Sequence, residues 1–508
     1  MKTHNFKWVF AALAVIFTMI SCSEEFLEVP VKGTNLESNY YKNEGEAFAG
    51  LVSVYDVMRK YGGGFENMIT FMNAGSDDFR AGGGNASDGI GIQSFDDFNI
   101  TPTTMPQSYW SDFYQGIFRA NFLLTKLPEV PMDENVKARF TAETKALRAM
   151  YYFELVRLFE NIPLITRPLE SSEFNNVPQA PPSDVYNQIV EDLLAAIGDL
   201  PLTVPGEQAG RLNKGAAQAL LGKVYLQMGL NSQAADQLRE VNGTPGETNQ
   251  YGNKLLADFG DLWEVDNKFN TESIIEAAHT NASSSHWGNW GSGADEGNSV
   301  NTMVGPRSYS QLTNEAPDLP SGWSFNPVEP ELYNLLENDP RFDATILDMA
   351  ALVAAGAADY LPGYEDTGYF LKKFIPTRDD VTTGTGEPIL NYRQNVYVIR
   401  LADTYLMEAE ALGGTGERAQ ALLDAVRARV GLPSIQVSLT AISAERRLEL
   451  AGEGHRFFDL VRTGRAAQAL GDEGYQAGVH NRLPIPYRET QNTIIEQNSG
   501  YQEKKQLL

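Results

Sequence analysis

Apolar residues recur every three or four positions between residues 138 and 159, with charged residues between them. This spacing places the apolar side chains along one face of a helix. The pattern ends at Asn161-Ile162-Pro163, where proline disfavours a continuing helix. A second helical pattern begins after Pro181-Pro182, and Ser183 is expected to cap its N-terminus. The sequence therefore predicts two consecutive helices joined by an irregular link.

The same helical spacing returns in other parts of the chain. It covers residues 109–124, 213–228, 398–412 and 417–429, and a short helix is expected to begin at Asn231 or Ser232. Helix, short turn and helix alternate without an exact sequence period, which is typical of tetratricopeptide-like units that bury their faces against one another. We expect a mainly α-helical protein, with its scaffold at about 40–60, 109–241 and 395–465.

The segments between these helical regions have a different composition. Residues 61–108 and 242–390 are rich in Gly, Asn, Ser, Asp, Thr and aromatic residues, and they show little periodicity. Compact proteins seldom spend so many residues on loops unless the loops bind something. We therefore expect the helices to form the scaffold and these two segments to form the binding surface.

The N-terminus has the composition of a secretory signal. Lysines precede an apolar run from Trp8 to Ile20, which is too short to cross a bilayer that needs about 20 residues. Ser21 and Cys22 follow the run, and Cys22 is the single cysteine of the chain. We predict a signal peptide at residues 1–21, acylation of Cys22, and one large domain at residues 22–508. The alternatives are a transmembrane anchor and a cysteine that stands by coincidence at an ordinary cleavage site.

The formal net charge of −26 narrows the range of partners. Such a surface repels polyanions, and no cluster of Lys and Arg suited to nucleic acid is present. Sulfated or uronate-rich polysaccharides are disfavoured for the same reason. A neutral ligand fits this charge better, although the acidity also fits a purely solubilising role.

Catalytic motifs are absent from the sequence. No two histidines of the mature chain have the spacing of a zinc protease, and neither a nucleophile elbow nor a phosphate-binding loop occurs. The acidic pairs Asp77-Asp78, near Arg80, and Asp96-Asp97 lie among aromatic residues. They are open to four interpretations: solvated loop acids, partners for sugar hydroxyls, calcium ligands and a catalytic carboxylate pair.

The tryptophans divide into two groups. Trp110 and Trp263 stand among apolar residues, which predicts that they pack in the core. Trp287, Trp290 and Trp323 stand in polar, glycine-rich loops that cannot easily bury an indole. A sugar ring can stack its C–H face on such a ring while its hydroxyls meet Asp, Asn or Arg. We predict that these three residues contact a glycan.

The C-terminal region carries the most specific pattern. ERRLELAGEGHRFFDLVRTGR, at residues 445–465, resembles the hallmark of the SusD/RagB family of outer-membrane nutrient-binding lipoproteins. Further stretches agree with that family in order and spacing, at residues 141–166, 211–229 and 396–412 and in the terminal RLPIPYRET and QNSGY. Together with the lipoprotein signal, the resemblance covers essentially the whole chain.

The resemblance implies four tetratricopeptide-like helix pairs with irregular loops that carry the ligand site. It also implies a SusC-like TonB-dependent transporter as partner, a cell-surface location on the outer membrane, and capture of glycans without cleavage. Within the signature, charged residues such as Arg446 and Glu449 are expected to form ion pairs at helical spacing, and His455 is expected to be structural.

No ligand contact carries over rigorously from the family. The candidate ligand contacts are therefore Asp77, Asp78 and Arg80 together with the three loop tryptophans. The glycan is expected to be neutral, with a laminarin-like β-glucan as the weakly favoured choice. A surface glycosidase, and a binder of peptide or glycoprotein-derived nutrients, stay open as alternatives.

Overall fold

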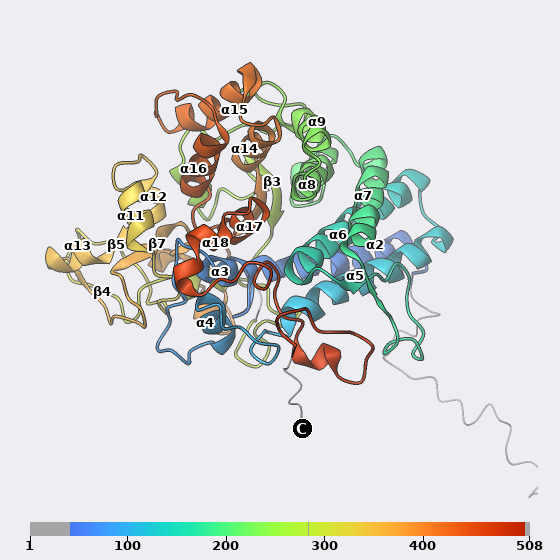
Figure 1. The fold of residues 1–508 in the computed structure, drawn as a ribbon, viewed down its shortest axis with the longest axis horizontal. Coiled ribbons are helices and arrows are strands. Elements are labelled where there is room, and N and C mark those ends of the chain that lie inside the picture. Colours follow the sequence, from blue (N-terminus) through green and yellow to red (C-terminus); the bar gives the residue numbers. More distant parts are fainter. Residues whose placement is uncertain (1–40, 283, 503–508) are drawn as a thin grey trace, which may run out of the picture. The chain divides into compact units, whose positions relative to one another are not determined.

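The computed structural model describes residues 41–282 and 284–502, and residues from Asn43 onward form one compact unit (Figure 1). The predicted signal peptide and Cys22 lie outside the described residues. No helix within the described part of the chain is long and apolar enough to cross a membrane.

Helices are the main regular structure of this unit. The first group comprises α2 (Glu44–Tyr55), α3 (Met68–Ala74), α4 (Ile90–Asp96), α5 (Ser108–Lys126), α6 (Glu134–Phe159), α7 (Pro182–Asp199), α8 (Lys214–Gln227) and α9 (Asn231–Asn242). The second group comprises α10 (Val300–Met303), α11 (Pro330–Leu336), α12 (Phe342–Thr345), α13 (Met349–Ala354), α14 (Leu401–Ala411), α15 (Gly416–Arg429), α16 (Leu439–Glu449), α17 (Arg456–Arg462) and α18 (Ala466–Ala469). The predicted mainly α-helical fold is confirmed.

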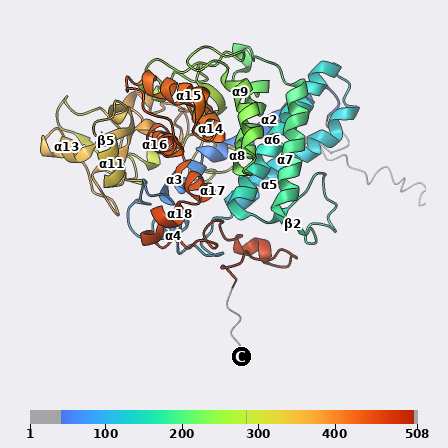
Figure 2. The same cartoon turned by 45° about the horizontal axis from the view of Figure 1, so that its top comes forward.

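The longer helices pack in a continuous row. Figures 1 and 2 show it running from α2, α5 and α6 through α7, α8 and α9 to α14, α15 and α16. Within the row the helix pairs α2–α5, α6–α7, α8–α9 and α14–α15 are in contact, and α9 packs on α14 to join the two halves of the chain. Each pair buries its apolar face against its neighbour, as the tetratricopeptide-like pattern predicts.

Two helix starts differ from the prediction. Helix α7 begins at Pro182 rather than after a Ser183 cap, because proline has the φ angle and the missing N–H that suit a first helical turn. The sequence predicts a helix over residues 398–412, but α14 begins only at Leu401. The residues before it, Val396–Arg400, form the buried strand β8. Strand β8 is fixed by antiparallel pairing with β3 (Ser273–Ala277).

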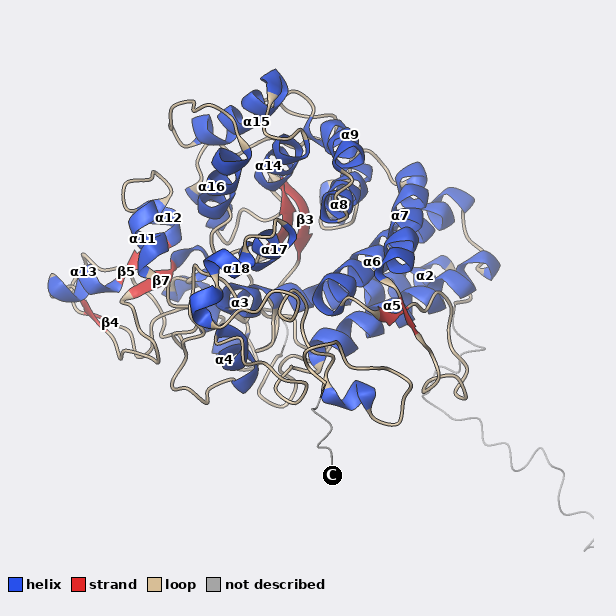
Figure 3. Cartoon of the chain, in the orientation of Figure 1, coloured by secondary structure: helices blue, strands red, loops and turns tan. Residues whose placement is uncertain are grey.

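Strands are few and short, as Figure 3 shows. The described residues contain four two-stranded sheets, which pair β1 (Ile162–Pro163) with β2 (Gln179–Ala180), β3 with β8, β4 (Ser310–Gln311) with β6 (Ala358–Asp359), and β5 (Ile346–Asp348) with β7 (Tyr369–Leu371). The pairs β4–β6 and β5–β7 lie in the segment 242–390 that is predicted to be loop-rich, and they give it a defined framework.

The segment 61–108 is less of a surface loop than predicted. Every residue of α3 is buried, and Phe71 stacks on Phe95 of α4 with 4.7 Å between ring centroids. Phe71 also lies 4.6 Å from the ring of Tyr109 in α5. Polar composition hid this core, because the apolar residues belong to helices too short to show a period.

The two core tryptophans are confirmed. Trp110 is 4% exposed and packs on Phe159. Trp263 makes an edge contact with Phe374, and the ammonium of Lys373 lies 4.5 Å from its ring centroid. Both rings therefore stabilise the scaffold.

Candidate functional site

The three loop tryptophans lie together. Trp287 and Trp323 are nearly parallel, with 6.0 Å between centroids and 20° between ring planes. Trp290 stands at right angles to both, 5.6 Å from Trp287 and 5.4 Å from Trp323. Trp287 is 56% exposed, a large fraction for an indole. We call these three residues the tryptophan platform.

Helix α10 holds both loops of the platform in place. The Trp290 indole N–H donates to the hydroxyl of Ser299, which precedes α10, at 2.8 Å. The backbone N–H of Trp323 donates to the carbonyl of Thr302 within α10, at 2.9 Å. Every residue of α10 is buried. The platform is therefore attached to a buried element, which keeps its rings in position before a ligand arrives.

The loop that carries Trp323 packs closely against the backbone at Gly305. A Cβ atom on Gly322 would lie 2.4 Å from the Cα of Gly305, so position 322 needs glycine. The platform continues inward through aromatic edge contacts, because Phe65 lies 5.9 Å from Trp290 and 5.2 Å from Phe325.

Polar groups stand at the edge of the same loops. The Arg307 guanidinium lies 3.4 Å from the carboxylate of Asp88. The backbone N–H of Gly84 donates to that carboxylate at 2.7 Å, and the backbone N–H of Arg307 donates to the hydroxyl of Ser324 at 2.9 Å. Both charged side chains are about one-third exposed, so they can exchange hydrogen bonds with a ligand. Sequence reasoning missed this pair, since its members are 219 residues apart.

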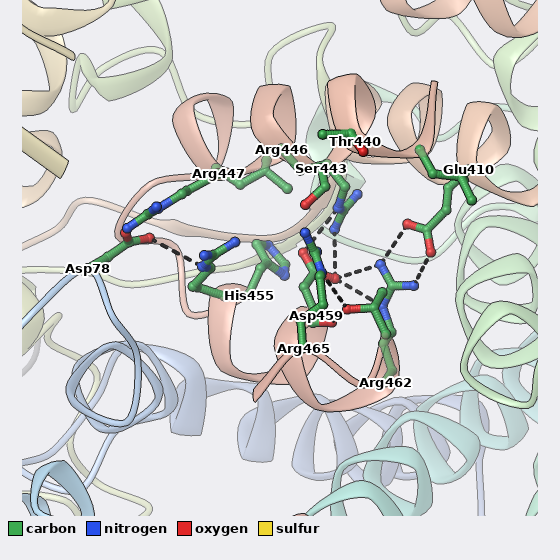
Figure 4. A pocket seen from close by; sticks show the side chains of 14 residues that line it. Asp78, Glu410, Thr440, Ser443, Arg446, Arg447, His455, Asp459, Arg462 and Arg465 are labelled. Carbon is green, nitrogen blue, oxygen red and sulfur yellow. Dashed lines mark hydrogen bonds and ion pairs between the residues drawn. The ribbon is translucent and has the colours of Figure 1, made fainter. Parts of the chain in front are cut away.

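The structure places the predicted ligand contacts Asp77 and Asp78 against the C-terminal helices. Asp78 is 1% exposed, and Arg447 of α16 donates to it at 2.7 Å (Figure 4). Arg456 of α17 donates two hydrogen bonds to the carboxylate of Asp77, at 2.7 and 2.6 Å. These carboxylates connect the 61–108 segment to the C-terminal helices through ion pairs with Arg447 and Arg456.

Arg80 also forms ion pairs within the protein. Its guanidinium pairs with Glu329 and lies 3.8 Å from Glu473, with its side chain 33% exposed. Among the six candidate residues, the three tryptophans come together in one partly exposed group.

A cavity of about 250 Å³ lies beside the C-terminal signature and is walled by ion-paired arginines (Figure 4). Arg446 donates to Asp403 at 2.7 Å and to Asp459 at 3.0 Å. Arg462 pairs with Asp459, at 2.7 Å, and with Glu410. Among the ion pairs of these residues, Arg462–Asp459 alone has the predicted helical spacing; the others join distant segments.

The comparisons with known proteins agree with this geometry. Residues 222–501 match the model of the SusD family, and residues 49–226 match a model described as starch-binding associating with outer membrane. The chain belongs to the SusD family. A relative from Formosa agariphila, SusD-like protein P25, is 25% identical over 99% of this chain and 100% of its own.

Solved structures of the SusD family show the same fold. A laminarin binding SusD-like protein is 72% identical, with a TM-score of 0.90 over 91% of this chain and all of that chain. Surface glycan-binding protein A from Bacteroides thetaiotaomicron, in complex with laminarihexaose, is 25% identical, with a TM-score of 0.80 over 90% of this chain and 99% of that chain. Both of these relatives are named as binding proteins.

The predicted structural role of His455 in the SusD signature agrees with its surroundings. Burial lowers the pKa of its imidazole to about 3, and Lys223 lies 3.5 Å from its ring nitrogen. Within residues 41–282 and 284–502, no group of three or more His, Cys, Asp and Glu is arranged to hold a metal ion.

A cluster of buried acids lies next to Arg80. Burial raises the pKa of Asp96 to about 8 and that of Glu473 to about 7. Glu365 and Glu473 lie near Asp96, and their charges raise its pKa further.

These raised pKa values predict a pH-dependent stability. A carboxyl whose pKa is higher in the folded state contributes fully below its unfolded value, near pH 4, and loses that contribution as the pH rises through its folded value, near pH 8 for Asp96. We expect Tm to fall by several degrees between pH 5 and pH 8.5. Asp96→Asn, which keeps an acceptor for the Ala81 N–H, should flatten this fall.

Differential scanning fluorimetry at a series of pH values measures this effect. The matched control is Asp236→Asn on the exposed side of α9, which should keep the wild-type slope. An unchanged slope in Asp96→Asn would contradict the assignment of the pH dependence to this cluster.

Proposed function

We propose that this protein binds a neutral, laminarin-type β-glucan on the tryptophan platform and does not cleave it. The observation that carries the proposal is the platform itself, in which three indoles from two loops form one partly exposed group. The name of the 72% identical relative, a laminarin binding SusD-like protein, supports the choice of glycan.

The energetics of the platform suit such a ligand. Each sugar face that removes on the order of 100 Å² of apolar surface from water contributes about 2–3 kcal/mol before the costs of ordering. Two or three such contacts give roughly millimolar to micromolar affinity. The net charge of −26 favours a neutral chain over a polyanionic one.

The proposed setting is the outer face of an outer membrane. Acylation of Cys22 would anchor the chain there, and the glycan would pass to a SusC-like TonB-dependent transporter. The description of the second matching family model, starch-binding associating with outer membrane, supports the location. The family resemblance of the C-terminal signature supports the partner.

Isothermal titration with laminarihexaose tests the proposal. We expect saturable binding with a dissociation constant between about 1 µM and 1 mM, little dependence on salt because the ligand is neutral, and much weaker binding of maltohexaose. Preference for maltohexaose would overturn the choice of glycan. Absence of binding to every soluble glycan would favour the alternative of a peptide-derived nutrient.

A reducing-end assay addresses the glycosidase alternative. Prolonged incubation of the pure protein with laminarin should release no new reducing ends. Release that persists through repeated purification would establish catalysis and replace the binding role.

A further inference from the structure

An open cavity of about 570 Å³ lies next to the tryptophan platform and is lined by three separate segments of the chain. These include residues 65, 66 and 71, residues 89–92 together with 102–107, and residues 486–488. Its volume falls in the range of about 300–1,000 Å³ in which small-molecule sites occur.

Phe65 connects this cavity to the platform. Its ring lines the cavity and lies 5.9 Å from Trp290 in an edge contact. Gly89 makes the close approach possible, because a Cβ atom there would lie 2.5 Å from the Phe65 ring and its φ of +72° favours glycine. The Phe65 side chain is therefore part of the cavity wall and is also in contact with the tryptophan platform.

Hydrogen bonds fix the walls of the cavity before any ligand binds. The backbone N–H of Tyr487 donates to the carbonyl of Pro102 at 2.8 Å. The side chain of Gln107 donates to Glu489, and the hydroxyl of Ser108 donates to Glu66. The C-terminal segment is thus held against residues 102–108, which keeps the cavity open at low conformational cost.

The lining has the mixed chemistry that a sugar requires. Tyr487 is 46% exposed and Ile90 is 63% exposed, so both present apolar surface to solvent. Thr103 and Arg488 are also exposed and line the same cavity. An exposed aromatic ring with hydroxyl and guanidinium groups nearby can stack one face of a sugar and bond its hydroxyls.

We propose that this cavity is a second saccharide subsite, which takes further residues of a glycan chain whose first part lies on the tryptophan platform. The proposal rests on the proposed function. Its consequence is that affinity grows with chain length beyond what the platform alone can bind. Tyr487 supplies the stacking surface, and Ile90 supplies part of the apolar wall.

Titrations with laminaritriose and with polymeric laminarin test this subsite. Tyr487→Ala should weaken the binding of laminarin about tenfold and leave the affinity for laminaritriose unchanged. Ile90→Gln should act in the same direction, while Leu439→Gln, at a leucine of α16 that is 53% exposed, should change neither affinity.

Two results would overturn the subsite. One is wild-type affinity for laminarin in both cavity variants, and the other is an equal loss for the trisaccharide and the polymer, which would assign Tyr487 to the platform. Failure of the proposed function is distinguishable from either, because the wild-type protein would then bind neither laminaritriose nor laminarin.

Discussion

Glu449→Ala is expected to lower the free energy of unfolding by about 3–5 kcal/mol, since removal of one partner leaves buried charges without compensation. Glu449 is fully buried and accepts hydrogen bonds from Arg400 at 2.7 Å and Arg341 at 3.1 Å, and it also pairs with Arg429. Those three guanidiniums come from β8, from the turn before α12 and from α15. The carboxylate therefore connects the C-terminal signature to three distant parts of the fold.

Urea unfolding followed by circular dichroism measures this change. Glu191→Ala provides a matched control, because Glu191 is an exposed helical glutamate on α7, and its removal should change stability by less than about 0.5 kcal/mol. A Glu449→Ala protein as stable as the control variant would contradict the role of the network.

The same network makes the stability of the folded protein decrease at low pH. Three arginines lower the pKa of Glu449 well below its usual range, and Arg400 lowers the pKa of Glu453 to about 2. A carboxyl with a lowered pKa contributes its stability above the unfolded value, near pH 4.5, and loses it as the pH falls through the folded value. The contribution of this network is therefore lost between about pH 4.5 and pH 2, opposite in sign to that of Asp96.

The helical scaffold could be predicted because its signal is local. The apolar period within α6 and α8 lies inside single segments, and Asn213 caps α8 by accepting from Ala216 at 2.8 Å. The partners of the signature could not be predicted in the same way. Arg446 faces Asp403, 43 residues away, and Arg447 faces Asp78, 369 residues away, so helical spacing pointed to the wrong neighbours.

The site was predictable in part for the same reason. A tryptophan in a polar, glycine-rich segment is a local signal, and it identified Trp287, Trp290 and Trp323. An acidic pair carries no such signal, since a carboxylate that binds sugar and one that binds a buried arginine have the same sequence. Phe65 was missed because its importance lies in its contacts with Trp290 and Phe325, both more than 200 residues away.

The combined substitution Trp287→Ala/Trp323→Ala is expected to weaken laminarihexaose binding about 1,000-fold, to below detection by titration. Each indole contributes about 2 kcal/mol of apolar contact with a sugar face, and two such losses correspond to about three powers of ten in affinity. Trp290 is left intact because its N–H bond to Ser299 holds the loop, so the variant tests contact rather than folding.

The single substitutions Trp287→Ala and Trp323→Ala are expected to have smaller effects than their combination. Trp287 and Trp323 are neighbours with 6.0 Å between centroids, and contacting residues seldom behave additively. Trp287→Ala exposes a face of Trp323 that can still hold one sugar, so we expect each single loss to be smaller than half of the combined loss in free energy. Phe174→Ala, which removes a 60% exposed ring remote in sequence, should retain wild-type affinity. Equal affinity in the double variant and in this control would show that the glycan binds elsewhere, because no other effect of these loops could restore two lost stacking surfaces.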